Sequence, residues 1–508
     1  MPVQKVYYSI PATNDSQTQL DSNDKLSNGF SFTKGNANIR FSIAAQDRLL
    51  DTADMYLTGQ VIHLDSSGDP IQVAAATTRA QFNADNGTDM RLYTNTNLGN
   101  WSGLETAIKR IFVQSKKSSV QIAQNNNYPM YKSVRNGYQN NDQDYLVSPL
   151  TRSDAAGKWS ESLGRHASIM PVATSSTSPD FGNIDNINDP NYGKPFSFKL
   201  DTALLNNIQP IHLGEQFMGG VVINIELNNS DGVYHSRFAR DGASIVSSAG
   251  NYYIIKNLRL TGRFSIPTPQ DLQNYQPQMM LNDRVNLVND VVSTTNSSKY
   301  TPNLGMVRSF VNLFLDSDQE NNVKKNQTNF QTVCGLREYQ QNKNSTRQPE
   351  DFVIKVSPNL LTKTVANGGT GTVNASLVAD PVLQQGDAEV RNRFQRAVLN
   401  GDLADKCSAS LVLTNNNLEA QYQTGGSATV GVGNNTLADL QGIGLDYSHH
   451  FGNTTNFVNQ DYDLLMRSGV QSGDAVLPAS RNGAPEIQQT YVRNVAVLNT
   501  QTLVKTVQ

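Results

Sequence analysis

The sequence predicts an all-β protein made of two consecutive β-rich halves. Apolar and polar residues alternate along 254–264, as on a half-buried strand, and Pro267 and Pro269 follow near mid-length. The chain has 508 residues, whereas single cores stop growing at roughly 250–300. Only 17% of residues are charged and 37% are hydrophobic, and Asn, Gln, Ser and Thr supply the remaining polarity. This composition favours short strands joined by long polar loops.

The alternation assigns each residue of 254–264 to a face. The inward set is expected to be Ile254, Lys256, Leu258, Leu260, Gly262 and Phe264. The outward set is expected to include Ile255 and four polar residues, which are candidates for contacts with the second half or another subunit: Asn257, Arg259, Thr261 and Arg263.

The first half is expected to span 29–264, after an extended N-terminal arm at 1–28. Its strands are predicted by period-2 alternation or by short apolar runs at 39–43, 55–61, 111–113, 196–200, 221–227 and 254–264. Long stretches without periodicity, at 65–102 and 124–194, are predicted to be surface loops.

A linker at 265–284 leads to a second half at 285–508. Strands are predicted there at 306–315, 352–356, 408–414, 429–432 and 492–504. One short helix is predicted, with Asp387 as N-cap, Gly401 past its end, and one apolar face formed by Val390, Phe394, Ala397 and Val398. Because helices are few and do not alternate with strands, a parallel α/β architecture is disfavoured.

Charge and cysteine content limit the class of protein. A formal net charge of −3 gives no electrostatic support for tight nucleic-acid binding. Two cysteines, Cys334 and Cys407, cannot form a disulfide framework for a chain of this size. No secretory signal is expected in 1–28, and no apolar stretch reaches the ~18–20 residues that span a bilayer. We therefore expect a soluble protein made in a reducing compartment.

The sequence offers no catalytic, cofactor-binding or metal-binding constellation, so we predict neither an enzyme nor a cofactor. Only His449 and His450 are neighbouring histidines, and adjacent residues on a strand point to opposite faces. Asp180-Phe181-Gly182 matches a protein-kinase tripeptide without the other kinase motifs. The glycine-rich segments 368–372 and 431–433 lack the Lys-Ser/Thr that follows a phosphate loop.

Two further clusters are expected to be structural. The basic residues Lys109, Arg110, Lys116 and Lys117 are expected to line the solvent face of a strand or to pair with acids across a subunit interface, in preference to binding nucleic acid or membrane. Four tyrosines are expected to pack in loops or contact protein: Tyr128, Tyr131, Tyr138 and Tyr145.

Several segments, in this order, carry a family resemblance. Phe196-Ser-Phe-Lys-Leu is followed by Ile208-Gln-Pro-Ile, by Gly219-Gly-Val-Val-Ile-Asn-Ile-Glu-Leu and by Tyr252-Tyr-Ile-Ile-Lys-Asn-Leu-Arg-Leu. This succession resembles the end of the first jelly roll in double jelly-roll major capsid proteins, especially those of virophages and Polinton-like viruses. Residues 39–61 and 107–115 resemble the opening and middle of that domain.

The resemblance implies two consecutive eight-stranded antiparallel jelly rolls in a virion capsid protein. It implies homotrimeric pseudo-hexagonal capsomers that tile an icosahedral shell, assembled inside the host cell without secretion. The loops 65–102, 124–194 and 357–380 would form an outer tower or subunit contacts, and the N-terminal arm would lie inside. Implied partners are other copies of the chain, penton and minor capsid proteins, and an internal membrane or the genome through the arm, without sequence-specific nucleic-acid binding.

Two alternatives are kept open. A carbohydrate-binding or glycan-active β-sandwich would need an aromatic platform or a carboxylate pair, and Trp101 and Trp159 lie in the long loops where a platform would sit. A viral fibre or adhesin would be expected to contain sequence repeats, and the chain contains none.

Overall fold

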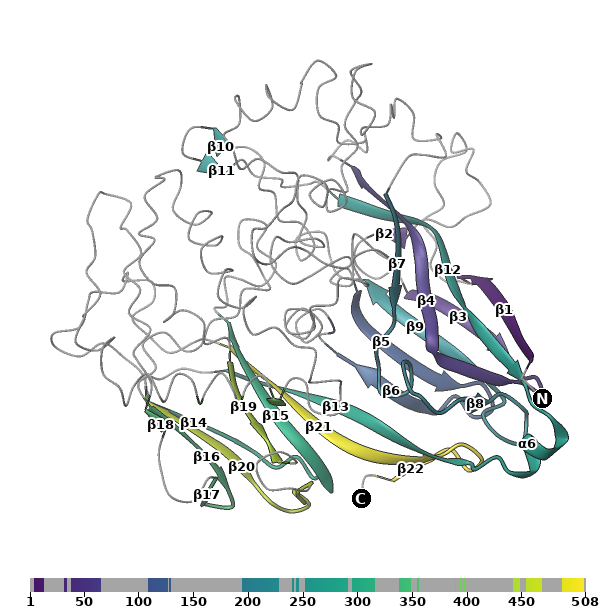
Figure 1. Cartoon of the computed structure of the whole chain (residues 1–508). Coiled ribbons are helices and arrows are strands. Elements are labelled where there is room, and N and C mark those ends of the chain that lie inside the picture. The colour runs from purple at the N-terminus through teal and green to yellow at the C-terminus, as the bar shows by residue number, and fades with distance from the viewer. Residues whose placement is uncertain are drawn as a thin grey trace.

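The protein is described from a computed structural model. The described residues are 4–12, 32–33, 38–64, 108–126, 128, 194–227, 240–241, 244–245, 252–290, 295–315, 338–348, 354–355, 389, 393, 396–397, 442–447, 454–467 and 487–506. They form two β-sandwiches that lie side by side, with long strands running between them (Figure 1).

The first sandwich consists of two antiparallel sheets. One sheet has the order β1 (Gln4–Pro11), β12 (Tyr252–Ile266), β4 (Leu49–Leu64) and β7 (Lys194–Lys199). The other has the order β3 (Asn38–Ala44), β9 (Gly220–Leu227), β5 (Ile108–Ser115) and β6 (Gln121–Asn125). The short strands β2 (Phe32–Thr33) and β8 (Ile211–His212) extend the first sheet, and β10 (Arg240–Asp241) pairs with β11 (Ser244–Ile245).

The second sandwich is built in the same way. One sheet has the order β13 (Gln278–Asp290), β21 (Ile487–Asn499), β15 (Met306–Leu315) and β19 (Gly442–Asp446), with β22 (Val504–Thr506) beside β21. The other has the order β14 (Thr295–Tyr300), β20 (Tyr462–Arg467), β16 (Glu338–Lys343) and β17 (Thr346–Gln348), with β18 (Ile354–Lys355) beside β16.

Strand pairing identifies the topology of each half. Among the eight main strands of the first half, taken in chain order, the first pairs with the eighth, the second with the seventh, the third with the sixth and the fourth with the fifth. The second half repeats these four pairings. A long antiparallel ribbon rolled up so that its strands alternate between two sheets gives this order, which is that of a jelly roll. The predicted fold class, two consecutive jelly rolls, is therefore confirmed.

The N-terminal segment differs from the expected arm. Residues 4–11 form β1, which pairs with β12 from Gln4 opposite Ile266 to Pro11 opposite Arg259. Tyr8 is buried and its ring lies 4.4 Å from that of Phe264. This part of the chain is thus the first strand of the first jelly roll, because it pairs with β12 in the same sheet and places Tyr8 in the core.

The connection between the halves is also shorter than the predicted linker. β12 continues to Ile266 and β13 begins at Gln278, so residues 267–277 join the two jelly rolls. Both ends of the predicted 265–284 segment pair in sheets. Its prolines and glutamines obscured the strand character of 278–284.

A β-bulge changes the face pattern of β12. The register shifts between Lys256 and Arg259, and Asn257 has a φ of 52°. As a result Ile255 is buried although it was assigned outward, while Leu258 and Leu260 are buried as expected. A single extra residue reverses the phase of the alternation, which period-2 reading of the sequence does not detect.

The second half confirms some predicted elements and adds others. The strand expected at 306–315 is β15, and that at 492–504 corresponds to β21 followed by β22. The segments 408–414 and 429–432 lie outside the described residues. Of the predicted helix, the helical residues described include Arg393 and Ala397, both buried, whereas Asp387, Val390, Phe394, Val398 and Gly401 are not described.

The hydrophobic core has two clusters. The first fills the first jelly roll and also includes residues from the second half: Met279, Leu281, Ala496, Leu498 and Leu503. The second lies inside the second jelly roll and is rich in aromatic rings, with Phe310 stacked on Tyr462 at 3.8 Å between ring centroids. The first core therefore extends across the boundary between the two halves.

Candidate assembly surfaces and the joint between the jelly rolls

The joint between the two jelly rolls begins with a capped helical turn, α6 (Pro269–Gln273). Thr268 is its N-cap, and its hydroxyl accepts from the backbone N–H of Asp271 at 3.2 Å. The Asp271 carboxylate accepts in return from the backbone N–H of Thr268 at 2.8 Å. The hydrogen bonds from Thr268 lower the pKa of Asp271. This reciprocal capping box, with Pro269 in the first turn, fixes the direction in which the chain leaves β12.

Tyr275 then anchors the joint to the first jelly roll. Its hydroxyl accepts from the backbone N–H of His212 at 3.1 Å. Its ring lies 5.4 Å from that of His212 and 5.1 Å from that of Phe217, both in edge-on geometry. Such aromatic contacts hold the connecting segment against the β8 turn.

Polar side chains of the first jelly roll also bond to the backbone of the second. Asn207 donates to the carbonyl of Met280 at 2.9 Å, and Gln209 donates to the carbonyl of Gln278 at 3.0 Å. Lys117 reaches the carbonyl of Gln501 at 3.5 Å. Together with the shared apolar cluster, these bonds make the two jelly rolls one structural body.

A polar layer separates the two cores along β13 and β21. Asp283 and Asn494 lie opposite each other on these strands and are buried, and Lys505 of β22 pairs with Asp283. On one side Leu281 and Ala496 belong to the first core, and on the other Val492 belongs to the second. Neither side-chain polar atom of Asn494 has a hydrogen-bond partner in the described part of the chain.

The second core contains a polar network between its two sheets. The amide of Asn312 donates to the hydroxyl of Tyr462 and to the carbonyl of Ile443, each at 3.0 Å. Its oxygen accepts from Gln488 at 3.0 Å and from Thr490 at 2.8 Å. Because the Asn312 side chain donates two hydrogen bonds and accepts two, this buried amide is fully satisfied. A satisfied polar group in a core stabilises one arrangement of the sheets.

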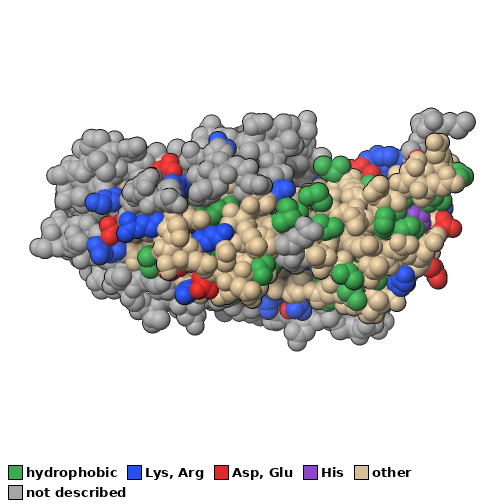
Figure 2. All heavy atoms as spheres, turned by 90° about the horizontal axis from the view of Figure 1, so that it is seen from below, with side chains coloured by type: hydrophobic (Ala, Val, Ile, Leu, Met, Phe, Trp, Pro, Cys, Tyr) green, Lys and Arg blue, Asp and Glu red, His purple; other side chains and the backbone are tan. Residues whose placement is uncertain are grey.

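Several apolar side chains remain exposed on the described surface. Ile208 is 94% exposed beside the joint, Tyr7 is 68% exposed on the edge strand β1, and Met280 is 59% exposed on β13. The view from below shows separate groups of hydrophobic side chains on this face (Figure 2). These groups are candidates for protein contacts, because isolated apolar side chains of this size gain from burial.

The predicted basic cluster has mainly structural contacts. Glu226 on β9 pairs with Arg110 at 2.8 Å and with Lys109 at 3.7 Å, both on the neighbouring strand β5. Lys116 and Lys117 are exposed in the turn after β5, and Lys117 makes the contact across the joint. Lys109 and Arg110 thus pair with an acid inside one sheet of the same chain, and the predicted pairing across a subunit interface stays a prediction.

The outward polar residues of β12 bind neighbouring strands of their own sheet. Arg259 donates to the hydroxyl of Ser9 at 2.6 Å and to its carbonyl at 3.0 Å, which attaches β1. Arg263 pairs with Asp54 of β4. The described contacts of these arginines lie on both sides of β12 within the first jelly roll and do not join the two halves, while a contact with another subunit stays a prediction.

The remaining candidates fall mostly outside the described part of the chain. This applies to Trp101, Trp159, Cys334, Cys407, His449 and His450, and to 180–182, 368–372 and 431–433. Of the four tyrosines, only Tyr128 is described, and it is buried. Among the described residues, no group of three or more His, Cys, Asp or Glu is placed to hold a metal ion, and no helix is long and apolar enough to cross a membrane.

Comparison with known proteins gives structural neighbours only. No family model and no curated protein sequence matches the chain. The mavirus major capsid protein is similar at 9% identity and a TM-score of 0.45, over 98% of this chain and 89% of that one. A chain in the cryo-EM structure of the Sputnik virophage is similar at 10% identity and a TM-score of 0.46, over 99% of this chain and 88% of that one. PBCV-1 VP54, fitted into a cryo-EM reconstruction of the Sputnik virophage, is similar at 10% identity and a TM-score of 0.46, over 100% of this chain and 97% of that one.

The chain has a double jelly-roll fold. This assignment rests on the strand pairing, which is the same in both halves. These three neighbours are viral capsid structures of similar extent to this chain.

Proposed function

We propose that this chain is a major capsid protein whose functional unit is a homotrimer. The observation that carries the proposal is the repetition of one strand order in two jelly rolls joined through a common apolar cluster. A subunit with two similar barrels presents two similar lateral surfaces. Three such subunits around a threefold axis place six barrels in a ring, which gives a pseudo-hexagonal outline suited to close packing in a shell.

The joint supports this role mechanically. A capsomer keeps its outline only if the two barrels of each subunit hold a fixed angle, and here the capping box, Tyr275 and the shared core hold them together. The stated function needs no catalytic group. Icosahedral assembly, the virion location, and contacts with penton and minor capsid proteins belong to the same proposal.

The proposal takes a different form at the N-terminus from the one expected from the sequence. Residues 4–11 pair with β12 as β1, so the proposed arm toward a membrane or genome does not include them. The glycan-binding alternative depends on Trp101 and Trp159, which are not described, and no observation on the described residues favours it.

Negative-stain electron microscopy of the purified full chain tests the proposal. We expect class averages of three-fold symmetric particles with a six-sided outline. Monomeric bilobed particles as the sole species at micromolar concentration would contradict it. Binding of a glycan with loss of that binding in Trp101→Ala or Trp159→Ala would support the alternative instead.

A further inference from the structure

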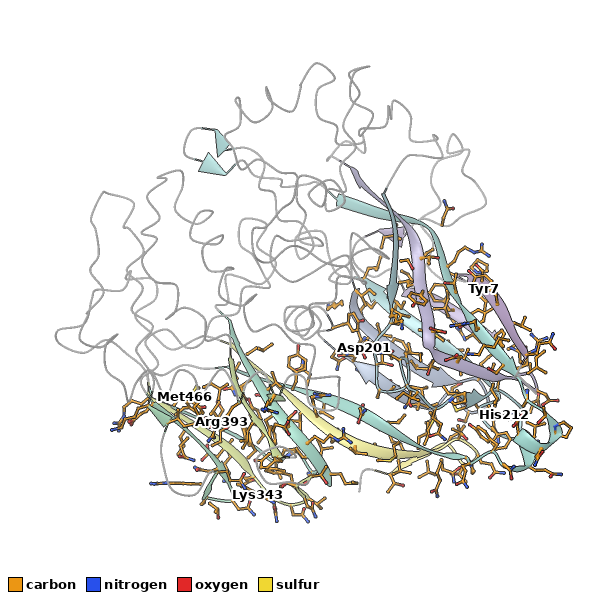
Figure 3. The ribbon with its side chains drawn as sticks, viewed as in Figure 1. Tyr7, Asp201, His212, Lys343, Arg393 and Met466 are labelled. Atoms are coloured by element: carbon orange, nitrogen blue, oxygen red, sulfur yellow. The ribbon has the colours of Figure 1, made fainter. Side chains whose placement is uncertain are left out.

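The joint between the jelly rolls contains a buried histidine whose neutral form has a structural role. His212 of β8 is 1% exposed, and its Nδ1 accepts from the backbone N–H of Gly214 at 2.9 Å. An Nδ1 that accepts carries no proton, so the proton of the neutral ring is assigned to Nε2. Figure 3 shows His212 at the end of the first jelly roll, close to the turn that contains α6.

The ring contacts both the turn after β8 and the connecting segment. Phe217 lies 4.4 Å from the His212 ring, and Tyr275 of the 267–277 connection lies on it edge-on at 5.4 Å. A Cβ atom on Gly214 would stand 2.7 Å from Cε1 of His212. The imidazole therefore fits against Gly214 with no room for an added methyl group, and its position sets that of Tyr275.

The ionisable groups around His212 have opposing effects. Burial lowers the pKa of His212, and the carboxylate of Asp47, in the turn before β4, acts more weakly in the other direction. The Arg48 guanidinium faces the Phe264 ring at 5.9 Å, Glu215 is exposed, and the Tyr275 hydroxyl is bonded to the His212 backbone. Burial has the larger effect, so the pKa of His212 lies below its ordinary value, in agreement with Nδ1 acting as an acceptor.

We propose that His212 is an acid-sensitive latch between the two jelly rolls. Protonation places an N–H on Nδ1 that faces the N–H of Gly214, so an acceptor is replaced by a second donor. The 212–217 turn then separates from Tyr275, and the 267–277 connection loosens while both jelly rolls stay folded. The inference concerns the single chain and does not depend on trimer formation.

The direction of the pH effect follows from proton linkage. A His212 that leaves the latch regains its ordinary pKa near 6.5, whereas the latched residue has a lower one. The latched state is therefore fully favoured above about pH 6.5 and loses its advantage as pH falls through the lower pKa. Each unit of pKa difference corresponds to a tenfold change in the equilibrium between latched and loosened forms.

Hydrogen–deuterium exchange of the full chain tests the latch. The protection of peptides covering 267–277 is compared with that of β15 between pH 7.5 and 5.0, after correction for the intrinsic pH dependence of exchange. We expect protection of 267–277 to fall about tenfold per unit of pKa depression, while β15 stays protected. In His212→Asn, whose side-chain oxygen replaces the Nδ1 acceptor without titrating, protection of 267–277 is expected to be the same at both pH values.

Two further variants keep the test decisive if His212→Asn folds poorly. Tyr275→Phe removes the acceptor of the His212 backbone N–H but keeps the ring. Compared with the wild-type chain, it is expected to lower protection of 267–277 at pH 7.5 and to give the same protection at pH 5.0. Gly214→Ala displaces the imidazole and is expected to give the loosened value at both pH values. Equal protection of 267–277 at pH 7.5 and 5.0 in the wild-type chain, or the same pH profile in His212→Asn, would overturn the latch.

Discussion

The side chains of Asn312 and Tyr462 meet inside the second jelly roll, with 3.0 Å between Nδ2 and the phenolic oxygen. Asn312 belongs to β15 in one sheet and Tyr462 to β20 in the other. Gln341 of β16 also donates to the Tyr462 hydroxyl, at 2.8 Å. The two sheets are therefore joined by directional bonds in addition to stacked rings, and these bonds fix one packing of the sheets.

Asn312→Leu is expected to lower the free energy of unfolding by roughly 2–4 kcal/mol, because it leaves several buried groups without their partner. Denaturant unfolding followed by fluorescence measures the change. Asn494 provides a matched control, since it is equally buried but has no side-chain hydrogen bond in the described part of the chain. Asn494→Leu is expected to cost much less than Asn312→Leu. Equal losses in the two variants would show that volume, and not the polar network, dominates.

Removal of residues 1–11 is expected to destabilise the first jelly roll. Tyr8 packs against Phe264, and Arg259 binds Ser9, so the deletion exposes apolar surface of β12 and leaves the Arg259 guanidinium without these two bonds. Thermal unfolding of the truncated chain is expected at a clearly lower temperature than that of the full chain. An unchanged midpoint would restore the interpretation of this segment as a free arm.

Glu226→Gln tests the basic cluster. Glu226 is the acid that pairs with Lys109 and Arg110, and all three side chains are partly exposed. We expect a loss of at most about 1 kcal/mol, which decreases as the salt concentration rises. Chemical denaturation at 50 mM and 500 mM NaCl measures both effects. A loss that does not depend on salt would point to packing of the side chain as its main role.

Acid pH is expected to weaken the second jelly roll through Asp461. Its carboxylate accepts from Lys299 at 2.8 Å and from Thr301 at 2.6 Å, and these bonds lower its pKa from the ordinary value of 3.8. Because the folded-state pKa of Asp461 is lowered, its stabilisation is complete above the ordinary pKa of 3.8 and is lost as pH falls through the folded-state pKa. Asp461→Asn is expected to reduce the difference between denaturation midpoints at pH 7 and pH 3. If Asp461→Asn shows the same difference between the midpoints at pH 7 and pH 3 as the wild-type chain, this carboxylate does not contribute.

The sequence predicted the architecture because alternation is strong where one face of a strand is buried. β3 shows this directly, because Ile39 and Phe41 are fully buried whereas Arg40 between them is exposed. Alternation fails where the buried face is polar. β16 reads Glu-Tyr-Gln-Gln-Asn-Lys, which resembles a loop, and its glutamines become interior groups only through partners such as Tyr462.

The joint was less predictable, since its contacts link residues far apart in the chain. His212 belongs to no recognisable motif in the sequence, although it lies beside Tyr275 across the boundary of the halves. The capping box of the connection was not predicted, although Thr268 and Asp271 have the three-residue spacing that it requires. The partner of Tyr275, by contrast, has no sequence signal of its own.

The mass of the purified full chain in solution tests the central claim most directly. Multi-angle light scattering after size exclusion, at micromolar concentration and neutral pH, is expected to give three times the 55.7 kDa of the single chain. A mass of one chain throughout this concentration range would contradict the proposal that the double jelly roll functions as a trimeric capsid subunit.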